Sequence, residues 1–225
     1  MVMPVLSRSP SPPMAQVVFR IGVVGHRPNR LPKDEPTMQA LRDMIRAVLE
    51  DAKVAVLAAT NEAPVATLYS EEPPAFRAIS PLAEGIDRIF AKEALSLGYE
   101  LCCPMPFSQQ EFESDFLAPA ALEADSLTHF REILKQAQIG PGLVTFELDG
   151  DRSNPEIAYG AAGRIVLNQS DLLILVWDGG RPGGVGGTVQ TMQEAIRHHV
   201  PVVWIDALVP DAWQIVRDES MQLRS

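Results

Sequence analysis

The feature that most constrains the fold of this chain is an alternation of short apolar runs with longer segments of helical periodicity. The runs at 17–25 and 171–180 are rich in Val, Ile and Leu, and segments with apolar residues three or four positions apart follow them. Runs of this kind are typical of strands that are buried on both faces, which occur in parallel sheets. The alternation therefore predicts an α/β fold with one doubly wound, mostly parallel sheet and helices on both faces.

The expected elements define a single domain. We expect strands at 17–25, 76–85, 100–107, 142–150, 171–180 and 201–207, and helices at 34–60, 86–99, 154–170 and 188–199. The domain spans 17–210, between a flexible N-terminal tail (1–16) and a C-terminal tail (211–225). A helical insertion at about 108–138 is interpreted as a lid over a base or as a dimer surface.

The charge of the chain argues against nucleic acid as a partner. The formal net charge of the 225 residues is −10, whereas affinity for phosphate backbones comes mostly from Lys and Arg. We therefore expect no nucleic-acid partner, although a few arginines can still create a local basic pocket.

Two further patterns concern location. The sequence has no run of about 18 apolar residues, which predicts no membrane span, and its N-terminus lacks the continuous apolar stretch of a signal peptide. The two cysteines, Cys102 and Cys103, are adjacent, which favours buried reduced thiols. We expect a cytoplasmic protein, and no spacing in the sequence indicates a metal site.

Ligands of open α/β sheets lie beyond the carboxyl ends of the strands, so the loops that follow the strands are examined first. After the first strand come Gly25, His26 and Arg27. Glycine permits close approach of a ligand or of another chain segment, and the two side chains offer donors to an anion. The alternative is a tight surface turn with a salt bridge.

The second loop, 80–88, precedes a helix whose free N–H groups favour an anion. It supplies the candidate binding residues Ser80, Glu84, Gly85, Asp87 and Arg88. Asp87 is expected to bind a sugar hydroxyl or to cap the helix. A helix-capping loop without a ligand is the alternative.

The third loop, 177–188, contains six glycines before a helix. It predicts a nest of backbone N–H groups around phosphate, preceded by Asp178 as a ribose ligand. The residues of this nest are Gly183, Gly184, Gly186, Gly187 and Thr188. A flexible loop without function is the alternative, and no Gly-Lys-Ser/Thr of a P-loop follows.

Together the three loops resemble a known superfamily. "VVGHR", "SPLAEGID" and "GGVGGT" followed by "EA" are similar to motifs of the Rossmann-like superfamily that joins DprA, the Lonely Guy (LOG) enzymes and the SLOG sensor domains. Pro81 stands where the DprA signature has glycine. The resemblance implies a Rossmann-like domain that binds a nucleotide or nucleotide-derived ligand, with Arg27 and Arg88 on its phosphate.

The resemblance leaves the activity open. A SLOG-type binding module is preferred, and the alternative is a LOG-like phosphoribohydrolase or a nucleoside deoxyribosyltransferase. The catalytic glutamate of the LOG pattern would fall on Thr191, so the candidates are Glu194, one helical turn later, and Glu84. A structural domain without a ligand is a third option. The expected partner is a small-molecule nucleotide, with no nucleic acid and no membrane. A homo-oligomer, a dimer formed by helices beside the cleft, is also expected.

Overall fold

The computed structural model describes residues 13–180 and 188–216. Within these ranges seven strands form one sheet, in the order β4-β3-β2-β1-β5-β6-β7. All pairs are parallel except the antiparallel pair β6–β7. The strands are β1 (Val18–Gly25), β2 (Ala75–Ile79), β3 (Glu100–Met105), β4 (Leu143–Glu147), β5 (Leu172–Trp177), β6 (Val202–Asp206) and β7 (Trp213–Val216).

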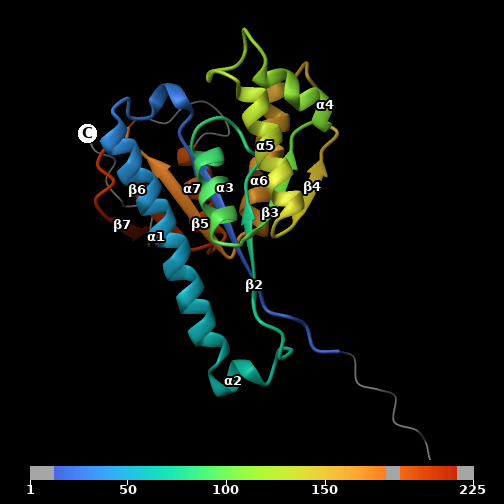
Figure 1. Cartoon of the computed structure of the whole chain (residues 1–225), viewed down its shortest axis with the longest axis vertical. Coiled ribbons are helices and arrows are strands. Elements are labelled where there is room, and N and C mark those ends of the chain that lie inside the picture. The colour runs from blue at the N-terminus through green and yellow to red at the C-terminus, as the bar shows by residue number, and fades with distance from the viewer. Residues whose placement is uncertain (1–12, 181–187, 217–225) are drawn as a thin grey trace, which may run out of the picture.

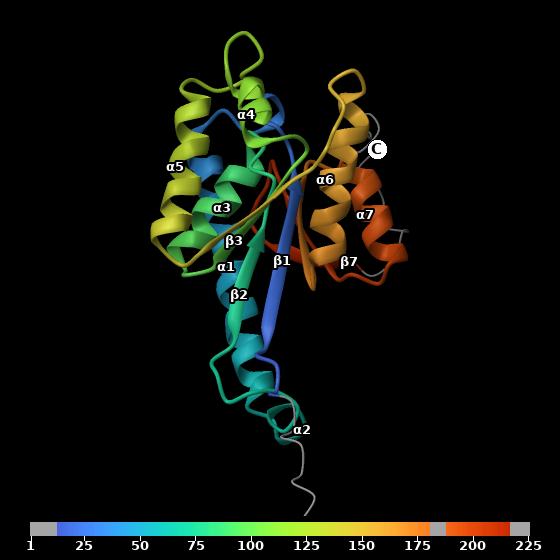
Figure 2. The ribbon, with the colours of Figure 1, turned by 90° about the vertical axis from the view of Figure 1, so that its right-hand side faces the viewer.

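Helices cover both faces of this sheet, as Figure 2 shows: α1, α3 and α5 lie on one face, and α6 and α7 on the other. The predicted fold, a single Rossmann-like doubly wound α/β domain, is thereby confirmed. The helices are α1 (Glu35–Thr60), α2 (Ala63–Ala66), α3 (Ile86–Ser96), α4 (Gln109–Phe112), α5 (Ser126–Ile139), α6 (Pro155–Gln169) and α7 (Thr188–Arg197), with the 3-10 helices η1 (Pro28–Arg30) and η2 (Glu113–Phe116).

Two segments differ from the sequence-based description. The segment expected as an insertion at about 108–138 contains α4, η2 and α5, and α5 is the crossover between β3 and β4, with Phe130 and Ile133 fully buried. The sheet also continues into 211–225, because β7 pairs with β6. A four-residue strand has no periodicity of its own to reveal it, since its pairing partner supplies most of its stability.

The order of the strands fixes where a ligand can bind. The chain runs from β1 to β2 on one side, and β5 lies on the other side of β1. Crossovers on the two sides of such a point leave the sheet in opposite directions and open a crevice beyond the strand ends. The crevice here is expected at the carboxyl ends of β1 and β5.

Helix α1 is much longer than the strands that it covers. Asp34 caps it by accepting from the N–H of Thr37 at 2.9 Å, and its fully buried residues end at Leu49. A 26-residue helix is about 39 Å long. Its C-terminal part therefore passes beyond the sheet and leads to α2, well away from the domain (Figure 1). Among the described residues, no helix is long and apolar enough to cross a membrane.

The two parts of α1 should respond differently to the same substitution. Leu49→Ala removes a fully buried side chain and should lower the free energy of unfolding by about 2–5 kcal/mol. Leu57→Ala, on the same helix but 42% exposed, should cost less than about 1 kcal/mol. Urea denaturation at low protein concentration compares the two variants. Equal losses would show that the C-terminal part of α1 is packed as tightly as the rest.

Candidate ligand-binding cleft

A cavity of about 530 Å³ lies at the expected crevice. Its walls come from the ends of β1 and β5, from the loops after β1, β2 and β3, and from α3, α4, α6 and α7. The lining residues are Val23, Val24, Gly25, His26, Arg27, Asn29, Arg30, Pro81, Ala83, Asp87, Pro106, Phe112, Tyr159, Ala162, Gly163, Val166, Trp177, Thr188, Val189 and Thr191.

The first two predicted loops are in direct contact. The N–H of Ile86 donates to the carbonyl oxygen of His26 at 3.2 Å. A methyl group added to Gly25 would lie 2.7 Å from Cγ2 of Ile86, and one added to Gly85 would lie 2.5 Å from that carbonyl oxygen. Both glycines are therefore required where two chain segments meet, one of the two roles that the sequence left open for Gly25.

His26 connects the turn after β1 to the end of β5. Its Nε2 lies 3.1 Å from the backbone nitrogen of Asp178 and 3.0 Å from its Oδ1. Burial lowers the pKa of the imidazole, although Asp178 opposes this effect. The ring is thus mostly neutral at pH 7, and it serves to hold two loops together.

Asp178 is also paired with Arg30. Burial acts to raise the pKa of Asp178, but the Gly180 N–H, Arg30 and His26 outweigh it and lower the pKa below its usual value. Nη2 of Arg30 donates to Oδ2 at 2.9 Å. Asp178 is therefore committed to neighbouring side chains, not placed freely for a ribose.

Arg27 is the exposed guanidinium on the cavity rim. Among the described residues no carboxylate lies within 4.0 Å of it, whereas Arg30 has Asp178. Arg27 is therefore available to an anionic ligand. Its guanidinium offers such a ligand five donors and a fixed positive charge.

Asp87 is buried and lines the cavity from the first turn of α3. Its Oδ2 accepts from the N–H of Ala83 at 3.2 Å. Burial raises the pKa of this carboxyl to about 7, against the opposing charges of Arg27 and Arg88. Near neutral pH Asp87 can therefore donate or accept a hydrogen bond. A buried acid with a shifted pKa in a cleft is a candidate functional group.

Three other candidates from the second loop serve the fold. Ser80 Oγ donates to the carbonyl oxygen of Asp87 at 3.1 Å. Glu84 Oε1 accepts from the N–H groups of Leu122 and Glu123. Arg88 is buried and donates to Leu82 and Ser126, over the ring of Phe116. None of the three lines the cavity. Arg88 was predicted to contact phosphate, but its guanidinium points to Leu82 and Ser126 and away from the cavity lining.

The third loop is placed only at its two ends. Gly183, Gly184, Gly186 and Gly187 lie outside the described residues, so the phosphate nest stays a prediction, while Thr188 lines the cavity as the first residue of α7.

Glu194 does not line this cavity. It lines a smaller groove of about 180 Å³ beside Arg164 on α6, and its Oε1 accepts from Gln190 Nε2 at 3.1 Å. Gly163 and Thr191 line both this groove and the cavity, so the two adjoin. Among the described lining residues Asp87 is the sole carboxylate, so neither predicted catalytic glutamate is positioned there.

An aromatic wall is the part of the cleft that sequence reasoning missed. Phe112, Tyr159 and Trp177 line the cavity from three separate elements. Burial and the neighbouring Asp115 raise the pKa of Tyr159 to about 12, so its hydroxyl keeps its proton and donates to Asp115.

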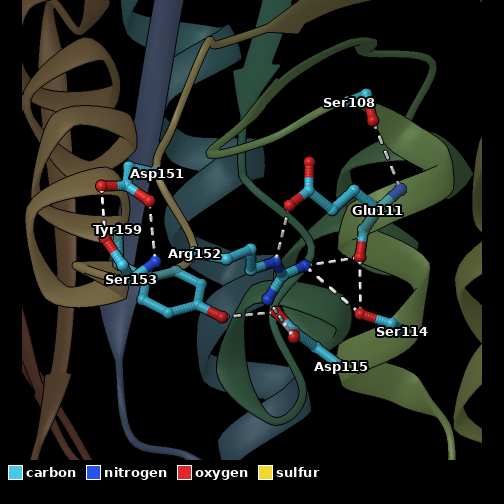
Figure 3. Close-up of polar contacts among 8 residues, drawn as sticks. All are labelled: Ser108, Glu111, Ser114, Asp115, Asp151, Arg152, Ser153 and Tyr159. Atoms are coloured by element: carbon cyan, nitrogen blue, oxygen red, sulfur yellow. Dashed lines mark hydrogen bonds and ion pairs between the residues drawn. The ribbon is translucent and has the colours of Figure 1, made fainter.

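A polar network around Arg152 and Asp115 holds Tyr159 in place (Figure 3). Arg152 Nη1 donates to Asp115 Oδ1 at 2.6 Å, and Nε donates to Glu111 Oε1 at 3.2 Å. The guanidinium also lies 3.7 Å from the centre of the Phe107 ring. These contacts join segments about 40 residues apart, which no local sequence pattern reveals.

The described residues include no group of three or more His, Cys, Asp and Glu side chains placed to hold a metal ion. Cys102 and Cys103 are both free and buried, and burial raises the pKa of each thiol.

No family model and no curated protein matches the sequence. Two solved structures are similar. One is DNA processing protein A (DprA) from Streptococcus pneumoniae, with 17% identity, a TM-score of 0.47, and coverage of 85% of this chain and 53% of that one. The other is DNA processing protein A from Helicobacter pylori, whose title names a single-stranded DNA binding mode, with 16% identity, a TM-score of 0.47, and coverage of 83% and 65%.

The chain thus spans about half of the first structure and under two thirds of the second. The resemblance of the sequence motifs to the superfamily that includes DprA stays a prediction.

The predicted function and partner need correction. A small-molecule nucleotide ligand without nucleic acid was expected, whereas the Helicobacter pylori structure is titled for binding single-stranded DNA. The exclusion of nucleic acid rested on the net charge of the whole chain, and the small nucleotide on the three loops and the superfamily resemblance. A net charge says little about the charges inside a cleft, and Arg27, Arg30 and Asp87 all line this one.

Gly85→Ala should destabilise the protein more than Gly98→Ala. Both glycines have positive φ, +94° and +80°, which disfavours alanine at either position. At Gly85 the ψ of −129° places the residue in a region that only glycine populates readily. At Gly98 no atom lies within 4 Å of the added methyl group, whereas at Gly85 it meets the His26 carbonyl. Thermal unfolding should show the larger loss for Gly85→Ala, at roughly 2–4 °C per kcal/mol. Equal shifts would mean that the two loops separate at little cost.

Asp87 should make stability depend on pH. Its pKa rises from 3.8 in the unfolded chain to about 7 in the fold, so the folded state binds more protons between these values. Stability from this group is therefore complete below pH 4 and is lost as the pH rises to about 7, by up to roughly 4 kcal/mol. Asp87→Asn lacks this loss, so its advantage over the wild type in urea denaturation should grow from pH 4 to pH 7. Parallel pH profiles would contradict the buried ionisable role.

Proposed function

We propose that the cleft binds single-stranded nucleic acid, with one nucleotide seated in the cavity. The observation that carries the proposal is the combination, in one cavity, of Arg27, which has no carboxylate within 4.0 Å among the described residues, with aromatic side chains. Tyr159 is 42% exposed, whereas Phe112 and Trp177 are buried and contribute only the edge of the lining. Single-stranded DNA is the ligand named for the Helicobacter pylori protein, but the support comes from the chemistry of the cavity.

The phosphate of the bound nucleotide pairs with Arg27 on the rim. A guanidinium forms charge-assisted hydrogen bonds with phosphate oxygens and presents two donors side by side. The net charge of −10 limits the remaining contacts with the strand. We therefore expect one or two phosphate contacts, and a salt dependence much weaker than that of a basic groove.

The base occupies the apolar part of the cavity. Stacking of a base on an aromatic side chain is worth about 1–3 kcal/mol and tolerates any base. A base in a duplex cannot enter a cavity of this kind, because it is paired and stacked. The cleft should therefore select single strands over duplexes.

Asp87 faces the same cavity and supplies a hydrogen bond to the base edge or to the sugar. With a pKa of about 7 it can act in either protonation state near neutral pH. A phosphate close to Arg27 would favour the protonated form, since a nearby negative charge raises the pKa of a carboxyl. We place this function in the cytoplasm, which the two free, buried thiols support.

Arg27→Ala should weaken binding of a fluorescein-labelled oligothymidylate by about tenfold or more, as expected for the loss of a hydrogen bond to a charged group. The slope of log K against log salt should fall in magnitude by about 0.7, the value of one phosphate contact on a single strand. Fluorescence anisotropy at several salt concentrations measures both quantities. Arg164→Ala is the matched control, because Arg164 is exposed on α6 and lines the smaller groove instead.

Three results would overturn the proposal. The first is absence of binding at low salt, and the second is equal affinity for a duplex of the same sequence. The third is competition by thymidine monophosphate at concentrations as low as those of the oligonucleotide, which would indicate a site for free nucleotides.

A further inference from the structure

The C-terminal part of α1, helix α2 and the turn after it form a projection that we call the arm, residues 54–70. It contains a single charged side chain, Glu62, in a chain whose overall charge is −10. Alanine, valine, leucine and tyrosine provide most of its other residues. Figures 1 and 2 both show the arm extending past the end of the sheet, away from the other helices.

The apolar side chains of the arm are exposed. Val54 and Leu68 are 68% and 69% exposed, and Leu57 and Tyr69 are 42% and 39% exposed. Single exposed apolar residues are ordinary, but a group of them on one projecting element marks an interaction site.

The rest of α1 shows where packing against the domain stops. The Nζ of Lys53 donates to the carbonyl oxygen of Leu97 at 2.7 Å and lies over the rings of Phe76 and Tyr99. Val56 is the last residue of α1 that packs against the main core. Among the described residues beyond it, the arm has no fully buried side chain.

Charge indicates what covers the arm. Two copies of a chain with net charge −10 repel each other over most of their surfaces, whereas the arm is nearly free of charge. Because the arm projects, two arms can meet while the acidic bodies of the domains stay apart.

The helical part of the arm suits pairing with itself. Val54 and Leu57 are three positions apart and therefore lie on neighbouring parts of the helix surface. Ala55, Ala58 and Ala59 are small and exposed, so a second helix can approach closely. A two-fold axis through the pair would place the same apolar surface on both sides, as closed dimers require.

We propose that the arm is the contact through which two copies of this chain associate, helix against helix about a two-fold axis. The arm lies at the end of the domain opposite to the carboxyl ends of β1 and β5, so the dimer leaves both clefts open. This proposal does not rest on the proposed function of the cleft. It places the dimer contact on the arm, whereas the sequence analysis expected it on the helices beside the cleft.

The test is the oligomeric state in solution. Sedimentation velocity of the full chain over a range of concentrations should show a monomer–dimer equilibrium. Val54→Glu should weaken the association at least tenfold, because it would bury an unpaired carboxylate in the contact. Leu68→Glu, outside the helix, should act in the same direction. Ile157→Glu on α6 is the matched control. Ile157 is 69% exposed, and the substitution adds the same charge at a place far from the arm.

Every outcome decides the matter. A wild type that stays monomeric at all concentrations overturns the proposal, and so does dimerisation that both arm variants leave unchanged. Dissociation by Ile157→Glu as strong as that by the arm variants would point to general repulsion or to the α6 surface, and also counts against the arm. Far-UV circular dichroism confirms that each variant is folded, and if Val54→Glu disturbs α1, Leu68→Glu decides.

Discussion

The cleft depends on one close contact, between the turn after β1 and the start of α3. The His26 carbonyl accepts from the Ile86 N–H, and Gly25 and Gly85 allow the two backbones to approach. The parallel strands β1 and β2 end at the same edge of the sheet, so the loops that follow them lie side by side. These two loops can touch here because Gly25 and Gly85 have no Cβ at the point of contact. This contact places Arg27 on the rim and Asp87 on the wall of one cavity.

The electrostatics of the cleft follow from burial as much as from charge. Asp87 lies in the first turn of α3 and has Arg27 nearby, two features that favour a carboxylate, yet desolvation outweighs them and raises its pKa to about 7. Asp178 is less buried and gains hydrogen bonds from Gly180 and Arg30, so its pKa falls. Two aspartates beside the same cleft thus differ in protonation because their surroundings differ.

Helix α1 joins two surfaces of unlike character. Its N-terminal part, as far as Leu49, packs Leu41, Ile45 and Leu49 into the core beneath the sheet. Its C-terminal part carries Val54 and Leu57 into solvent. The apolar stripe of Leu41, Ile45, Leu49 and Val56 faces the core. Val54 and Leu57 fall outside this stripe and are exposed. Only the length of the sheet, about 17–27 Å for strands of five to eight residues, decides where packing stops.

By itself the sequence determined the doubly wound α/β fold, the bounds of most elements to within a few residues, and the three loops beside the cleft. These features are local, because strand and helix periods and glycine positions are written along the chain. Tertiary structure alone decided that Glu84 and Arg88 face the 122–126 segment, that Glu194 lies in another groove, and that β7 extends the sheet. It also assembled the aromatic wall from Phe112, Tyr159 and Trp177. Side chains distant in sequence meet only after the layers pack, and the direction in which each points is set by its neighbours in space.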